Sequence, residues 1–262
     1  MSGRLLRIIF LLLTICIPLV ALAGCVGESP APTANQPGTA NYIDLGIAAH
    51  NKGDYDQAIA YYNQAITLEP TDATAFFDRA SAYDAKGDDK KAAEDYSQAI
   101  KLKPDYEAAY YGRGTANLYL DNFDEAIADF DQSIKLKPIN ARAYTNRCIA
   151  YYHKGNYTQA DADCTEAIKQ ADPAEEYLER TYDTRGLVHQ ARHEQQSAIK
   201  DFTQALQLNP KFWQSYYSRA KVYQEIGEKE KAIADYRKVL DLSNDPDLVR
   251  QARKELLALG AK

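Results

Sequence analysis

The chain has 262 residues, of which 45% are hydrophobic and 26% are charged, proportions that exclude disorder over most of its length. Its 31 basic and 37 acidic side chains give a net charge of −6 at neutral pH. This acidic balance argues against nucleic acid as a partner, because phosphate contacts need clustered lysine and arginine. The 20 tyrosines, against one tryptophan and one methionine, suggest that one residue type recurs at equivalent places in a repeat.

Residues 1–24 are predicted to be a signal peptide. Arg4 and Arg7 precede an uncharged apolar run over residues 8–23, which as a helix would span about 24 Å, less than the roughly 30 Å of a bilayer core. A basic start, an apolar middle and small residues after it are typical of a secretory signal. The end of the run, Leu22-Ala23-Gly24-Cys25, resembles the lipobox of bacterial lipoproteins.

The lipobox resemblance implies that Cys25 carries lipid and becomes the mature N-terminus. It further implies a bacterial envelope protein that contacts the membrane through this lipid, on the exported side of the plasma membrane or in the outer membrane. The alternative is an uncleaved signal anchor in which Cys25 has no role. Residues 26–40 contain Pro, Gly, Ser, Thr and Ala but no aromatic residue, so 25–40 is predicted to be a lipidated cysteine followed by a flexible linker.

Prolines mark a 34-residue period in the rest of the chain. Pro70, Pro104 and Pro138 are 34 residues apart, and Pro210 follows after twice that period plus four residues. Alignment on these prolines brings small residues to one position, namely Gly46, Ala80, Gly114, Cys148, Gly186 and Ala220. An alanine follows each of them twelve residues later, and aromatic residues precede the small positions by four residues. These spacings place small and aromatic residues on the same helix faces, so that two antiparallel helices can pack closely.

The pattern resembles the tetratricopeptide repeat, a 34-residue helix-turn-helix unit. The resemblance implies an all-α, right-handed α-solenoid over residues 41–246. Its six units cover about 39–72, 73–106, 107–140, 141–174, 179–212 and 213–246, and a capping helix follows over 247–262. Four extra residues near 175–178 follow a helix-start pattern at Asp172-Pro173, so we expect the first helix of unit five to be one turn longer.

Units two to six each carry an arginine on the first helix and an aspartate sixteen residues later on the second. The pairs are Arg79 with Asp95, Arg113 with Asp129, Arg147 with Asp163, Arg185 with Asp201, and Arg219 with Asp235. Unit one lacks both charges, which favours structural ion pairs within each unit. The alternative is an arginine ladder that binds a ligand.

Cys148 and Cys164 occupy two positions of unit four that face the seam between its helices, and we predict a disulfide between them in an oxidising compartment. The alternative is a pair of reduced, buried thiols. His189 and His193 have a spacing that can bind metal, but they lack the HExxH pattern, and His189 replaces a core tyrosine of other units. We therefore predict a packed core histidine, no metal site, no cofactor and no catalytic residues.

The concave face that the resemblance implies carries aromatic and polar residues. The predicted groove contacts are Phe77, Tyr111, Thr115, Tyr119, Arg142, Asn146, Tyr152 and Tyr217, together with Ser81, Thr145, Asp183 and Lys221. Tyrosine and arginine commonly anchor protein interfaces. The alternative for any single tyrosine is that it covers a neighbouring helix.

One version of this family clamps the C-terminal carboxylate of a chaperone with Lys, Asn and Arg. Here the clamp positions hold Ile43, Ile47, Asp78, Ala108 and Gly112, so that ligand is not expected. The sequence as a whole predicts a membrane-anchored, non-enzymatic scaffold that binds a protein or peptide at a bacterial cell envelope. The alternative is an envelope enzyme or small-ligand receptor whose site lies in the groove.

Overall fold

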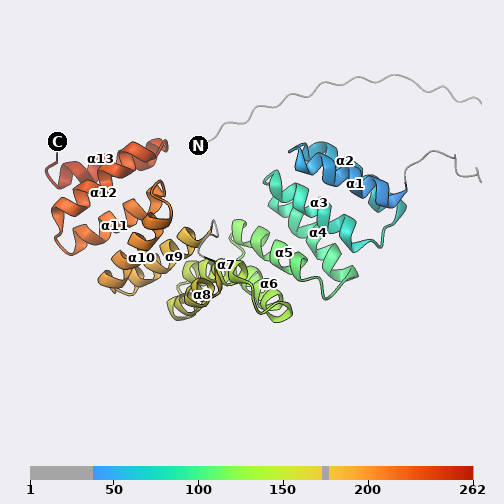
Figure 1. Cartoon of the computed structure of the whole chain (residues 1–262), viewed down its shortest axis with the longest axis horizontal. Helices are drawn as coiled ribbons and strands as arrows, with labels where there is room; N and C mark the ends of the chain where they lie inside the picture. The colour runs from blue at the N-terminus through green and yellow to red at the C-terminus, as the bar shows by residue number, and fades with distance from the viewer. Residues whose placement is uncertain (1–37, 173–176, 262) are drawn as a thin grey trace, which may run out of the picture. The chain divides into compact units, whose positions relative to one another are not determined.

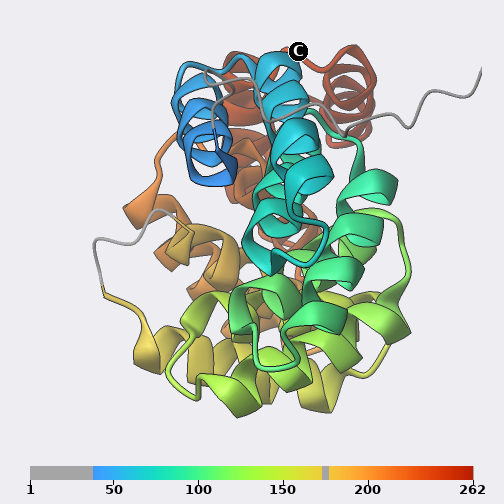
Figure 2. The ribbon, with the colours of Figure 1, turned by 90° about the vertical axis from the view of Figure 1, so that its right-hand side faces the viewer.

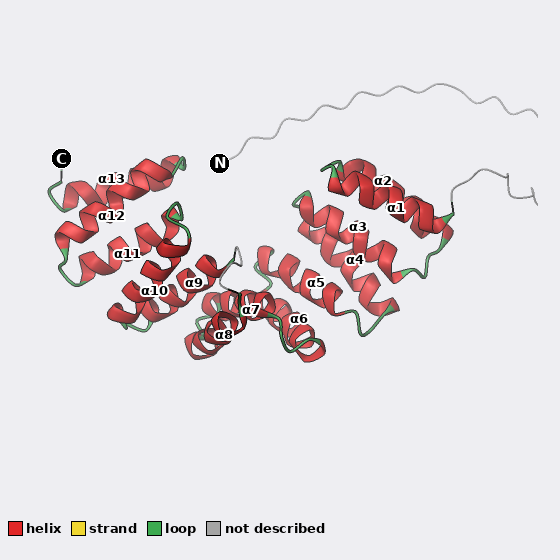
Figure 3. Ribbon diagram, viewed as in Figure 1, coloured by secondary structure: helices red, strands yellow, loops and turns green. Residues whose placement is uncertain are grey.

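The computed structural model describes residues 38–172 and 177–261. The predicted signal peptide, Cys25 and nearly all of the predicted linker lie outside these ranges. The described residues form thirteen α-helices and no strand (Figure 3). The helices are α1 (Thr39–Asn51), α2 (Tyr55–Leu68), α3 (Ala73–Ala85), α4 (Asp89–Leu102), α5 (Glu107–Tyr119), α6 (Phe123–Leu136), α7 (Ala141–His153), α8 (Tyr157–Gln170), α9 (Leu178–Ala191), α10 (Gln195–Leu208), α11 (Trp213–Glu225), α12 (Lys229–Leu242) and α13 (Pro246–Ala258).

The helices pack in consecutive pairs, α1 with α2 through α11 with α12, and α13 covers α12 at the end of the stack. Figures 1 and 2 show the pairs following one another along an arc. The first helices of neighbouring pairs contact each other; for example, α7 contacts both α5 and α9. The second helices of neighbouring pairs approach one another less closely. The stack therefore curves toward its first helices, which line the concave face.

Small residues let the two helices of a pair approach closely. A Cβ added to Gly46 would lie 2.4 Å from the ring of Tyr62, and one added to Gly186 would lie 2.6 Å from the ring of Phe202. In units one, three and five, an aromatic ring of the second helix therefore packs on the backbone of a glycine in the first helix. This follows directly from the spacing of small and aromatic residues in the sequence.

The turn inside each unit requires a left-handed backbone. Glycine supplies it in four units, as at Gly53 and Gly227, where φ is 78° and 80°. Asp121 and His193 take the equivalent places in units three and five, with φ of 59° and 60°. Aspartate and histidine are among the residues other than glycine that most often adopt this conformation.

The first helix of unit five does not gain the expected turn. Helix α9 has 14 residues against 13 in the other first helices, and it begins at Leu178 with Tyr177 as its N-cap. The start pattern at Asp172-Pro173 lies partly outside the described residues. Burial of Leu178 and a 2.9 Å hydrogen bond between the hydroxyls of Thr145 and Thr181 fix the first turn of α9 against α7, so the expected extra turn is wrong.

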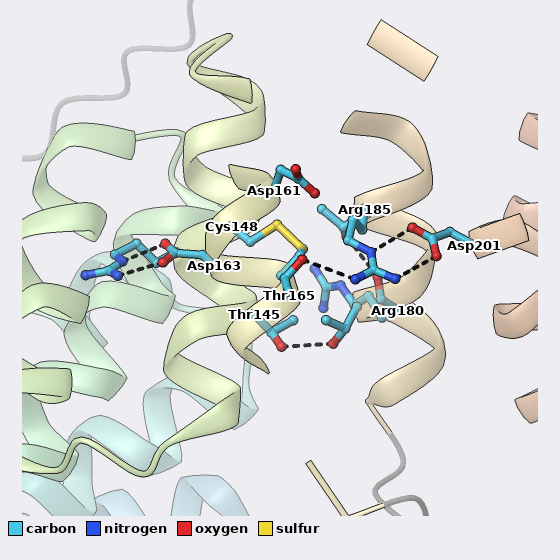
Figure 4. Close-up of a disulfide and its surroundings, with 12 residues drawn as sticks. Thr145, Cys148, Asp161, Asp163, Thr165, Arg180, Arg185 and Asp201 are labelled. Carbon is cyan, nitrogen blue, oxygen red and sulfur yellow. Dashed lines mark hydrogen bonds and ion pairs between the residues drawn. A yellow bond between two sulfur atoms is a disulfide. The ribbon is translucent and has the colours of Figure 1, made fainter. Parts of the chain in front are cut away.

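Each repeated arginine contacts both its own unit and the preceding one. Arg113 donates through Nε and Nη2 to both carboxylate oxygens of Asp129, at 2.9 and 2.6 Å, and through Nη1 to Ser97 Oγ of the preceding unit at 3.0 Å. Arg185 does the same with Asp201 and Thr165 (Figure 4). The third contact is made in all five units, to Asn63, Ser97, Asp131, Thr165 and Thr203. Protein acceptors thus occupy three nitrogens of every guanidinium, which favours a structural role over ligand binding.

Cys148 of α7 and Cys164 of α8 are joined by a disulfide, with their Cα atoms 5.5 Å apart (Figure 4). Both residues are fully buried. They stand where the other units pack a small residue of the first helix against an aromatic ring of the second. A covalent link therefore replaces that contact in unit four.

We predict that Arg113→Leu lowers the free energy of unfolding by about 2 to 4 kcal/mol, because it leaves the buried Asp129 carboxylate without its counter-charge. Urea unfolding followed by circular dichroism measures this. The control is Lys86→Leu, which breaks an ion pair with the exposed Asp56 and should cost less than about 1 kcal/mol. Equal losses from the two variants would contradict the role assigned to the arginines.

Thiol counting tests the disulfide. Denatured, non-reduced protein should show no maleimide reaction at Cys148 or Cys164, and the Cys148→Ser, Cys164→Ser double variant should lose roughly 3 kcal/mol of stability, as expected for a closed loop of about 17 residues. Modification of both thiols in the non-reduced protein would favour two free, packed cysteines.

Candidate functional site

A cavity of about 300 Å³ opens on the concave face where α5, α7 and α9 meet. We call it the arginine cavity. Its lining residues are Tyr111, Thr115, Tyr119, Arg142, Thr145, Asn146, Tyr177 and Arg180. Five of the eight principal contacts predicted from the sequence meet here: Tyr111, Thr115, Tyr119, Arg142 and Asn146.

One wall of the arginine cavity is a hydrogen-bonded link between α5 and α7. Asn146 Nδ2 donates to Tyr111 Oη and to Thr115 Oγ1, both at 3.2 Å. Burial raises the pKa of the Tyr111 hydroxyl above its usual value. The Tyr111 ring packs on Phe130 with centroids 6.1 Å apart, so this wall is rigid.

The other wall is cationic and aromatic. The Arg142 guanidinium lies over the Tyr177 ring, 5.1 Å from its centroid. Arg180 of α9 is exposed, and so is Tyr119, which retains 57% of its accessible surface. Arg142 and Arg180 give this wall positive charge, and the exposed Tyr119 ring gives it apolar surface. The net charge of the chain is negative.

The sequence analysis omitted two of these residues. Arg180 stands 38 residues after Arg142, which is the repeat period plus the four extra residues of unit five, so repeat equivalence alone could have identified it. Tyr177 precedes α9 in the segment that departs from the period. No repeat position predicts its contact with Arg142.

Three predicted contacts pack within the solenoid. Phe77 stacks on Tyr106 at 4.9 Å, and Tyr217 lies edge-on to Tyr236 at 5.8 Å. Tyr152 packs on Tyr157 at 6.0 Å. Tyr111 makes the equivalent contact with Phe130, so ring packing does not exclude these three residues, and they stay predicted groove contacts.

Thr145 and Asp183 were also expected as groove contacts, and the structure buries both side chains. Asp183 accepts a 2.6 Å hydrogen bond from Ser215 Oγ of α11, and burial raises the pKa of its carboxyl to about 6. It joins α9 to α11 and does not face a partner. The expectation for Asp183 is therefore wrong, because the curvature of the stack brings α11 over it.

His189, predicted to be a packed core histidine, is partly buried and lies beside carboxylates. Its Nδ1 lies 2.7 Å from a carboxylate oxygen of Glu194, and its Nε2 lies 3.5 Å from Asp201. His193 occupies the left-handed turn. Across residues 38–172 and 177–261, no three or more His, Cys, Asp or Glu side chains are grouped so that they could hold a metal ion.

A sequence model of the tetratricopeptide repeat matches residues 43–107 and 111–176, and a second model of the same repeat matches 214–246. The chain belongs to the tetratricopeptide-repeat family. Its helices form the solenoid of that family, with the arginine cavity on the concave face. Among the described helices of this tetratricopeptide-repeat protein, none has the length and apolar character needed to cross a bilayer.

Solved structures share this solenoid. The MamA protein is 26% identical, over 66% of this chain and 92% of that one, with a TM-score of 0.59. A tetratricopeptide repeat protein from Parabacteroides merdae is 24% identical, over 84% and 83%, with a TM-score of 0.61. YrrB, described as a tetratricopeptide repeat protein with an unusual peptide-binding site, is 18% identical, over 74% and 97%, with a TM-score of 0.57. No curated protein sequence matches the chain.

Proposed function

We propose that this tetratricopeptide-repeat protein is a membrane-anchored scaffold that binds a segment of a partner protein in its concave groove, at a bacterial cell envelope. The arginine cavity carries the proposal. It combines exposed tyrosine and arginine, the residues that most often anchor protein interfaces, with a rigid hydrogen-bonded wall. YrrB has the same fold and is described by a peptide-binding site, so the fold is compatible with this role.

The chemistry of the arginine cavity favours an acidic segment. Arg180 is exposed on α9, at the position equivalent to Arg142 of α7, and its guanidinium can receive a carboxylate of the partner. Tyr119 offers an exposed ring for a neighbouring apolar side chain. Such a mixed contact is specific because an unmatched charge in a partly buried site is costly.

A binding role is favoured over the enzyme alternative. Among the described residues that line the arginine cavity there is no carboxylate, histidine or cysteine to act as nucleophile or general base. Arginine, tyrosine, threonine and asparagine recognise a ligand more readily than they transform one. We therefore propose no catalytic step in the arginine cavity.

The membrane anchor is proposed from Cys25, which lies outside the described residues. The lipobox resemblance supports lipid at this cysteine, and each buried CH₂ of an acyl chain contributes about 0.8 kcal/mol of anchoring. The disulfide between Cys148 and Cys164 supports export, because disulfides persist in oxidising compartments. A lipid on Cys25 and a linker up to residue 38 would hold the solenoid near the membrane surface.

Crosslinking tests the groove. A photo-crosslinker placed at Tyr119 in the native envelope should capture a defined partner, and Arg180→Glu should reduce the yield at least fivefold, as loss of about 1 kcal/mol or more from an anchor implies. Arg237→Glu makes the same charge change on the exposed face of α12 and should leave the yield unchanged. Equal capture by the two variants would exclude the arginine cavity as the binding site.

Fractionation tests the anchor. Cys25→Ser should move the protein from membranes to the soluble exported fraction, because the acyl chains would be absent. Immunoblotting of membrane and soluble fractions reports the distribution. A Cys25→Ser protein that has lost its leader and still sediments with membranes would contradict the lipoprotein assignment.

A further inference from the structure

A second cavity of about 330 Å³ lies at the other end of the groove, lined by Ile47 and His50 of α1, Tyr62 of α2, and Asp78 and Ser81 of α3. We call it the Asp78 cavity. Asp78 Oδ2 and His50 Nε2 are buried here, and neither has a hydrogen-bond partner among the described residues. A buried carboxylate oxygen without a donor is costly and calls for an explanation.

Asp78 carries its charge among aromatic rings. Burial, and to a lesser extent the nearby Asp78 charge, raise the pKa of Tyr62, Tyr96 and Tyr106. No lysine or arginine of the described residues pairs with it: the adjacent Arg79 is already bound to Asp95. Burial, and then the nearby Asp72, raise the pKa of the Asp78 carboxyl to about 6.

The fold does not require an acid at this position. The equivalent residues of units three to six are Gly112, Asn146, Thr184 and Ser218. Asn146 is the informative member, because it occupies in α7 the place that Asp78 occupies in α3, and it lines the arginine cavity. The same repeat position on the concave face thus lines both cavities. It is Asp78 in one cavity and, in the other, Asn146 beside Arg142 and Arg180.

We propose that the Asp78 cavity receives a lysine or arginine side chain of the partner segment bound in the groove. A carboxylate in a cavity that is also lined by the Tyr62 ring suits an ammonium or guanidinium group, which gains both an ion pair and a cation–π contact. The lining of Ile47 and Tyr62 accommodates the apolar stem of such a side chain. The cation supplies the donor that Asp78 Oδ2 lacks.

This inference rests on the proposed function, and it adds the orientation in which the partner segment lies in the groove. The groove is acidic at units one and two and basic at units four and five. A segment with a basic residue near one end and an acidic residue near the other therefore binds in one orientation and is repelled in the reverse one.

The test is selection of a phage-displayed random peptide library on the full chain in detergent, with the bound peptides sequenced. The wild-type protein should enrich lysine or arginine at one peptide position. Asp78→Asn should abolish that enrichment and weaken binding of the selected peptides about tenfold or more, and Asp78→Lys should select aspartate or glutamate instead. Asp44→Asn is the matched control, since Asp44 is an exposed acid at the same repeat position of unit one, and it should leave the enrichment intact.

Folding of the variants is checked by thermal unfolding. Asp78→Asn should unfold at the same temperature as the wild type or a higher one at neutral pH, because burial disfavours the charge that it removes. Two results would overturn this inference and leave the proposed function standing. The selected peptides could bind through Arg180 with no enrichment of lysine or arginine, or that enrichment could survive Asp78→Asn. Failure of every peptide to bind any form of the chain would overturn the proposed function as well.

Discussion

Each arginine of units two to six holds three helices together, and the geometry of the groove depends on this contact. Arg147 pairs with Asp163 inside its unit and donates to Asp131 of the preceding one. Its ring neighbour Tyr144 lies 5.4 Å from the guanidinium. Because the same set recurs at every junction, each unit is fixed to the one before it by the same geometry, and the first helices are brought to one concave face.

That regular spacing allows isolated differences between units to act as recognition features. The same repeat position is glycine in α5, asparagine in α7 and aspartate in α3, and none of these changes disturbs the helix pairs. Asn146 bridges to Tyr111, while Asp78 remains without a donor. The charge of the groove therefore varies along its length on an otherwise constant frame, which favours a partner of defined polarity.

Unit four and the start of unit five are where the repeat departs most from its pattern. The Cys148–Cys164 disulfide replaces the contact between a small residue and an aromatic ring, and Tyr177, the N-cap of α9, lies under Arg142. Both departures lie beside the arginine cavity. A covalent link within the unit that carries Arg142 and Asn146 limits the motion of two residues that the proposed site uses.

The sequence by itself determined the helix pairs and their number, the packing of small residues against aromatic rings between the two helices of a pair, and the arginine–aspartate partners. All of these depend on spacing within one unit. It also identified six of the eight residues that line the arginine cavity, from the family resemblance and the repeat register. Only the tertiary structure decided which groove residues meet in one cavity, since Tyr217 shares the register of Tyr111 yet lines a separate cavity with Lys221. Burial of Asp183 under α11 and the unsatisfied carboxylate of Asp78 depend on how one unit is rotated against the next, and spacing along the chain does not encode that rotation.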